Sequence, residues 1–148
     1  MTLSDADIER IVTAVETAEE SLAVLADKQS LSREAYRADR ETRDVVERRF
    51  VKTTEAVLDI AETIVVHERD VHPESNPAAM ISLADLDVLK PETAEEMAQA
   101  ARFRNVLAHT YGDVIDHDEV YDALQDLTRY RDFLVEVRSY LDKIDAFS

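Results

Sequence analysis

The sequence has no cysteine, and it has only one glycine and three prolines among its 148 residues. Without cysteine, the chain can form no disulfide, no thiolate metal site and no cysteine nucleophile. The shortage of glycine and proline leaves little material for turns and strand boundaries, whereas alanine, leucine, glutamate and arginine, which are good helix formers, are abundant. The composition therefore predicts an all-α protein.

Long apolar runs are also missing. The chain has no run of about 18 uncharged apolar residues that could cross a membrane. Its first ten residues, MTLSDADIER, contain acidic side chains and lack the hydrophobic stretch of a signal peptide. We therefore expect a soluble, cytoplasmic protein. A chain of this length, 45% hydrophobic, is long enough for one core and too short to expect two, so residues 1–148 are expected to form a single domain.

Positive charge is scarce. Lysine and arginine number 17, of which four are lysine, against 33 aspartates and glutamates, and the net charge is −16. Such a surface repels polyanions at long range, which excludes a broad positive face for nucleic acid, so that any RNA contact must be local. The acidic excess is typical of a surface adapted to high salt, where screening over a few Å weakens self-repulsion. We therefore expect a halophilic source.

The hydrophobic periodicity predicts an antiparallel helical bundle of four main helices plus a short extra helix. The expected helices cover about residues 4–25, 32–67, 76–83, 91–112 and 116–144. The last is the most clearly marked, because Asp116 and Glu119 can form a capping box at its start. From Val120 to Ile144 its apolar residues recur at steps of three and four, which is the pattern of a bundle seam.

Arg104 interrupts the apolar side of the helix expected before Gly112, in the stretch RFRNVLAHTY of residues 102–111. It shares that side of the helix, within about 80°, with four neighbours, namely Met97, Ala101, Ala108 and Tyr111. Moving a guanidinium from water into an apolar contact costs several kcal/mol unless an anion or a full set of acceptors meets it. Arg104 therefore needs either an intramolecular carboxylate, such as Glu55 or Asp59, or a cleft that binds an anion.

His109 and Tyr111 follow Arg104 closely. His109 lies about 140° round a regular helix from Arg104, so the two cannot share a face within one subunit, whereas Tyr111 returns to the side of Arg104. A fixed cation, an imidazole that exchanges protons near neutral pH and a phenol are suited to phosphate chemistry. The spacing taken alone leaves open whether these residues act together.

The pattern R-N-x-x-x-H-x-Y, from Arg104 to Tyr111, is similar to the R-x4-6-H signature of the HEPN superfamily. It resembles in particular the HepT-type toxins, which pair with a minimal nucleotidyltransferase antitoxin. Residues 47–65, ERRFVKTTEAVLDIAETIV, resemble that family's second helix, with its acidic positions at Glu55 and Asp59. Residues 82–124 resemble its third and fourth helices, so that the resemblance covers roughly the last two-thirds of the chain.

The resemblance implies a HEPN-like, homodimeric, metal-independent endoribonuclease toxin of a type VII-like toxin–antitoxin pair, with two motifs facing each other across one cleft. Arg104, Asn105 and His109 are the implied catalytic residues. His109 would act as general base or acid, Arg104 would bind the phosphate oxygens, and Asn105 would orient His109 or the phosphate. Tyr111 is the implied site at which the nucleotidyltransferase attaches AMP, which would block the RNA substrate. No cofactor is expected.

Other interpretations of the histidines and of the function remain open. His67, His72 and His117 are expected to be surface or capping groups and not metal ligands. No histidine has an acidic residue three positions before it, which disfavours the Glu-x-x-His pairs of di-iron helical bundles. One alternative function is a non-catalytic HEPN module that binds nucleotide or a partner beside a nucleotidyltransferase, and another is a helical dimer that only assembles such a partner. The presence of both Arg104 and His109 favours catalysis.

Overall fold

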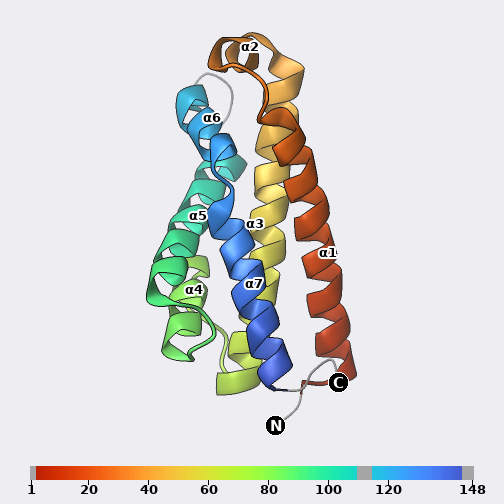
Figure 1. Ribbon diagram of the computed structural model, residues 1–148. Helices are drawn as coiled ribbons and strands as arrows, with labels where there is room; N and C mark the ends of the chain where they lie inside the picture. The colour runs from red at the N-terminus through yellow and green to blue at the C-terminus, as the bar shows by residue number, and fades with distance from the viewer. Residues whose placement is uncertain (1–2, 110–114, 145–148) are drawn as a thin grey trace.

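The computed structural model describes residues 3–109 and 115–144, and every regular element in those ranges is an α-helix (Figure 1). The elements are α1 (Asp5–Lys28), α2 (Arg33–Ala38), α3 (Arg40–Arg69), α4 (Asn76–Asp85), α5 (Pro91–His109), α6 (His117–Gln125) and α7 (Thr128–Lys143). The predicted all-α class is therefore confirmed. Among the described helices, none combines the length and the apolar character that crossing a bilayer requires.

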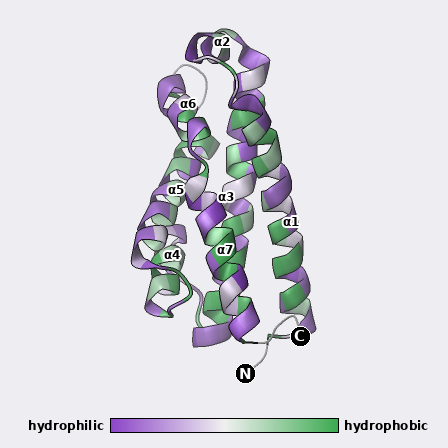
Figure 2. Cartoon of the chain, in the orientation of Figure 1, coloured by the Kyte–Doolittle hydropathy of each residue, from purple (hydrophilic) through white to green (hydrophobic). Residues whose placement is uncertain are grey.

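The long helices form an antiparallel bundle around α3. Figure 1 shows α1 rising from the end that holds both termini, α3 descending beside it, α5 rising and α7 descending, while α2 and α6 lie together at the opposite end. The helix α3 contacts all six other helices, and α5 packs against α3, α4 and α7. Hydrophobic and hydrophilic stripes alternate round the long helices in Figure 2, as expected for elements that bury one face in a shared core. The predicted bundle is thus present.

Side-chain caps mark the beginnings of the helices. The hydroxyls of Ser4 and Ser32 each accept a backbone N–H three residues later, at 3.1 Å, and so begin α1 and α2. Asp116 accepts the backbone N–H groups of Asp118 and Glu119, at 3.0 and 3.2 Å. Each bond satisfies an N–H that the first turn of a helix leaves without a partner. The start positions predicted at Ser4, Ser32 and Asp116 are therefore confirmed.

Two of the predicted helices are each divided in two. Asp39, in an extended conformation (φ −108°, ψ 100°), ends α2 and caps α3, where its carboxylate accepts the backbone N–H and the hydroxyl of Thr42. Asp126 is also extended and accepts the backbone N–H of Thr128, which separates α6 from α7. In both places a short acidic side chain competes for the backbone that would continue the helix. The predictions of unbroken helices over 32–67 and 116–144 are wrong for this reason.

An aromatic cluster joins three helices beneath the predicted motif. Phe50 of α3 is fully buried, and its ring meets that of Phe103 edge-on, with centroids 5.6 Å apart. The buried Tyr130 of α7 lies 6.3 Å from Phe50, and its hydroxyl is 2.9 Å from that of Thr54. Burial raises the pKa of Tyr130, so the phenol stays protonated and can donate this bond. Because Phe103 directly precedes Arg104, the cluster fixes the part of α5 that carries the motif.

At the α2 end of the bundle, α6 is tied to α2. Arg33 donates to Asp122 at 2.6 Å and to Asp118 at 3.2 Å, and its guanidinium lies 4.8 Å from the centre of the Tyr121 ring. The Tyr121 hydroxyl donates to the carbonyl of Leu31 at 2.6 Å. These contacts anchor the helix that follows residues 110–114.

Candidate nuclease site

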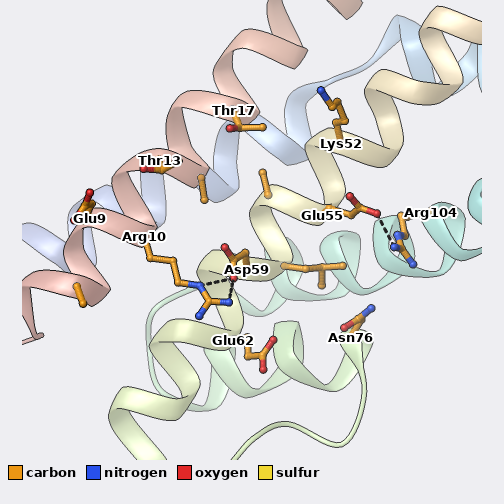
Figure 3. Close-up of a pocket in the computed structure, with 14 residues that line it drawn as sticks. Glu9, Arg10, Thr13, Thr17, Lys52, Glu55, Asp59, Glu62, Asn76 and Arg104 are labelled. Carbon is orange, nitrogen blue, oxygen red and sulfur yellow. Dashed lines mark hydrogen bonds and ion pairs between the residues drawn. The ribbon is translucent and has the colours of Figure 1, made fainter.

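Arg104 reaches from α5 to α3. Its Nη2 donates to Oε1 of Glu55 at 2.7 Å, and its Nη1 donates to Oδ1 of the neighbouring Asn105 at 3.1 Å. The close approach is possible because α5 packs its small buried residues, among them Ala98 and Ala101, against the bundle. Of the two carboxylates predicted as partners, Glu55 is therefore the one that binds Arg104 (Figure 3).

The pair leaves part of the guanidinium unsatisfied. Glu55 contributes one oxygen to one nitrogen, and Nε of Arg104 is buried without a hydrogen-bond partner among the described residues. The guanidinium has more N–H donors than these two hydrogen bonds use. A buried donor without an acceptor costs about 1–3 kcal/mol. An anion that entered beside Glu55 would supply the missing acceptors, and phosphate matches the fork geometry of arginine.

Asp59, the other predicted partner, binds a different helix. Arg10 of α1 approaches Oδ1 of Asp59 with Nη2 at 2.6 Å and Nε at 2.8 Å. The hydrogen bond and the negative charge of Asp59 raise the pKa of Arg10. Asp59, one helical turn after Glu55, is therefore already paired with Arg10.

These charges line an open groove of about 740 Å³ between α1 and α3, with Arg104 at its α5 end (Figure 3). The charged residues along it are Glu9, Arg10, Lys52, Glu55, Asp59, Glu62 and Arg104. The Arg104 side chain keeps 21% of its surface exposed, and that of Glu55 keeps 50%. Arg104 is therefore reached from solvent and is not sealed beneath the carboxylates.

His109 faces away from this groove. It is exposed and is the last residue of α5, which stays helical from Arg104 to His109. Five residues of regular helix separate the two side chains by about 140° and about 7.5 Å along the axis. Val106, three residues before His109 and about 60° from it, is 51% exposed. The chain therefore holds Arg104 and Asn105 together and His109 apart, while Tyr111 lies outside the described residues.

The remaining histidines each lie near a carboxylate. The exposed His72 has Nδ1 2.9 Å from Glu62, and His117 has Nδ1 4.0 Å from Glu47, whose carboxyl pKa is raised by burial. The Nε2 of His67 lies 3.9 Å from Glu68. Within residues 3–109 and 115–144, no three histidine or acidic side chains converge in a way that could hold a metal ion.

The contributions of α1 and of Lys52 to the groove were not predicted from the sequence. Arg10 reaches the groove from a helix whose sequence has no motif, and only the packing of α1 on α3 brings it to Asp59. Lys52 precedes Glu55 by three residues, a spacing that places both side chains on one face of a helix. Once Glu55 had been considered as a partner for Arg104, this spacing could have indicated that Lys52 lies beside the same site.

The comparisons with known proteins agree on one family. The family model described as ribonuclease HepT-like matches residues 8–137. The tRNA nuclease HepT of Aphanizomenon flos-aquae (strain 2012/KM1/D3) is 30% identical over 114 residues, which are 76% of this chain and 77% of that protein.

Two solved structures share the fold. A toxin–antitoxin crystal structure with AMP-PNP superposes with a TM-score of 0.81 at 17% identity, covering 88% of this chain and 98% of that one. The tri-AMPylated HEPN toxin of Shewanella oneidensis, in complex with MNT antitoxin, gives a TM-score of 0.73 at 20% identity, covering 93% and 99%. At such identities, the likeness to these structures shows the fold alone. The family model that matches residues 8–137 shows similarity in sequence as well. The chain belongs to the ribonuclease HepT-like family.

Proposed function

We propose that this protein is the toxin of a toxin–antitoxin pair and that it cleaves RNA without a metal ion. Its family, and a relative that is named a tRNA nuclease, support a nuclease activity. The observation that carries the proposal is Arg104, whose guanidinium has more donors than Glu55 and Asn105 accept and whose side chain is partly exposed on the charged groove. A phosphodiester that entered the groove would accept from the remaining donors.

In the proposed reaction, a ribose 2′-hydroxyl attacks the neighbouring phosphorus. His109 accepts the 2′-hydroxyl proton, the new P–O2′ bond forms, and the P–O5′ bond breaks. The leaving 5′-oxygen takes up a proton from water, so that the products are a 2′,3′-cyclic phosphate and a free 5′-hydroxyl. Arg104 binds the non-bridging oxygens, where charge develops in the transition state. Asn105 holds the guanidinium through its Oδ1.

The separation of Arg104 from His109 on α5 leads us to place the site between two subunits. Arg104 of one subunit and His109 of the partner subunit would converge on one phosphate in a homodimer. The exposed Val106, on the same side of α5 as His109, supports a covered α5 face, because a second copy would bury this apolar side chain.

The nuclease proposal is tested with purified, unmodified protein and single-stranded RNA in EDTA at high salt. The wild type is expected to release fragments that end in cyclic phosphate, and His109→Ala is expected to release none above background, since it lacks the general base. Mass spectrometry of the fragments gives the readout. His72→Ala, an exposed histidine beside Glu62, serves as a matched control that stays active. A wild type that is inactive under these conditions would favour the non-catalytic HEPN module.

We further propose that a minimal nucleotidyltransferase silences the toxin by AMPylating Tyr111. The tri-AMPylated Shewanella toxin with its MNT antitoxin supports AMPylation, and the motif resemblance implies Tyr111 as the residue. The phenol oxygen would attack the α-phosphorus of ATP, releasing pyrophosphate and leaving an anionic adduct seven residues after Arg104. The adduct would compete with RNA for the positive charge of Arg104.

Co-expression with the cognate nucleotidyltransferase is expected to raise the intact mass by one or more AMP units and to abolish RNA cleavage. Tyr111→Phe, which lacks the phenol oxygen, is expected to keep its unmodified mass in the same co-expression. Intact-mass spectrometry and the cleavage assay are read on the same samples. A wild-type chain that stays unmodified, or a Tyr111→Phe chain that still gains AMP, would contradict the assignment.

A further inference from the structure

We infer that Lys52 binds an RNA phosphate next to the scissile one, so that the groove between α1 and α3 holds the strand beyond Arg104. The inference deepens the proposed function and rests on it. Lys52 and Arg104 line the same groove from α3 and α5, with Glu55 between them (Figure 3).

Among the described residues, the three cations of the groove differ in whether a carboxylate pairs with them. Arg10 is bound by Asp59 at 2.6 Å, and Arg104 is bound by Glu55 at 2.7 Å. Lys52 makes no hydrogen bond or ion pair with any described residue, although Glu55 lies one turn away on the same helix. Its ammonium group is therefore the cation of this groove that an incoming anion can bind without displacing a carboxylate.

The charge at Arg104 also calls for a second cation. Glu55 already neutralises the guanidinium, so that a phosphate bound there would leave a net negative charge on a protein that carries −16. With Lys52 included, the two cations offset Glu55 and one of the two phosphates that the strand would place beside them. On so acidic a surface, RNA contact requires a local pair of cations of this kind.

The positions of the lysines support a role for Lys52 in binding. Lys28 and Lys143 lie in the last turns of α1 and α7, where a positive charge complements the helix dipole. Lys52 lies in the middle of α3 and is half-buried, so that the dipole does not explain it. Lys52 lines the groove, and Figure 3 shows its nitrogen turned away from the Glu55–Arg104 pair.

The two cations suit different phosphates. The rigid fork of Arg104 matches the scissile phosphate, whose oxygens must be held in a fixed orientation. Lysine is a point charge on a flexible stem and tolerates a phosphate in varied positions, as a flanking nucleotide requires. Three residues of α3 rise by about 4.5 Å, which sets Lys52 along the groove from the carboxylate that holds Arg104.

The test compares a dinucleoside monophosphate, which has only the scissile phosphate, with an RNA octamer in the unmodified protein. Lys52→Gln is expected to lower kcat/KM for the octamer about tenfold at low salt, through KM. The slope of log kcat/KM against log salt concentration should become shallower by about 0.7, the value for one phosphate of a single strand. The dinucleotide should lose far less, and Lys52→Arg should recover most of the octamer activity. Lys28→Gln, a matched control outside the groove, should behave as wild type.

Equal losses on both substrates, an unchanged salt slope, or a Lys28→Gln variant as impaired as Lys52→Gln would overturn the inference. Binding of a 2′-deoxy octamer, which cannot be cleaved by 2′-hydroxyl attack, separates this result from the fate of the proposed function. In fluorescence anisotropy, a tenfold loss of affinity in Lys52→Gln supports the subsite even if the wild type cleaves no RNA. Unchanged affinity contradicts the subsite even if the wild type is an active nuclease.

Discussion

Mixing the variants Arg104→Ala and His109→Ala is expected to restore RNA cleavage to about a quarter of the wild-type rate, although each variant alone is inactive. If each site takes Arg104 from one subunit and His109 from the other, a mixed dimer has one site with both residues and one with neither. Random exchange makes about half of the dimers mixed, and each of these has one of its two sites intact. The cleavage rate is measured after subunit exchange.

The cleavage rate expected for the mixture is far above the rate expected for either variant alone. Removing a general acid or base costs about 10² to 10⁴ in rate, and removing one group that stabilises developing charge costs about 10² to 10³. A return to within a few-fold of wild type is therefore unmistakable above either variant alone. Each variant should also be folded, because Arg104 keeps 21% of its side chain exposed and His109 is exposed.

A control separates a shared site from simple mixing. The double variant, which lacks both Arg104 and His109, should rescue neither single variant, since no dimer in that mixture has a complete site. Mixed dimers must be verified by native mass spectrometry of tagged subunits. Mixed dimers without recovered cleavage would place both residues of a working site in one subunit, against the 140° separation on α5 that led to the proposal.

Much of this fold could be predicted because its signals are local. The caps at Ser4, Ser32 and Asp116 depend on hydrogen bonds within three residues, and the apolar stripes depend on helical spacing alone. The breaks at Asp39 and Asp126 are local as well, but aspartate is common inside helices of so acidic a chain. Whether its carboxylate caps a new helix or faces solvent depends on the tertiary contacts of both helices, which periodicity does not report.

The part of the site that could be predicted is the part that depends on the cost of desolvating a charge. Arg104 stands out because a charge among apolar neighbours demands a partner, and Glu55 was one of two candidates. The choice between Glu55 and Asp59 was settled by Arg10, which takes Asp59 from a helix 49 residues away in sequence. No pattern within one helix indicates such a contact. The incomplete pairing of Arg104, with its buried Nε, likewise follows from packing.

Replacing Phe50 with alanine is expected to lower the free energy of unfolding by about 3–5 kcal/mol. The side chain is only 1% exposed, and its removal leaves a cavity between α3, α5 and α7 beside the rings of Phe103 and Tyr130. Urea unfolding should show a lower midpoint with an unchanged slope. Val135→Ala, at a position 66% exposed on α7, should stay within about 0.5 kcal/mol of wild type.

The edge-on contact between Phe50 and Phe103 makes a sharper prediction about what positions Arg104. In a double-mutant cycle, Phe50→Ala and Phe103→Ala should couple by about 0.5–1.5 kcal/mol beyond the loss of buried area. Because Phe103 directly precedes Arg104, this coupling measures how firmly the core holds the stretch of α5 that presents the guanidinium to Glu55. If the two losses simply add, the edge-on contact does not hold α5, and the other packing of α5 on α3, α4 and α7 fixes the helix at this point.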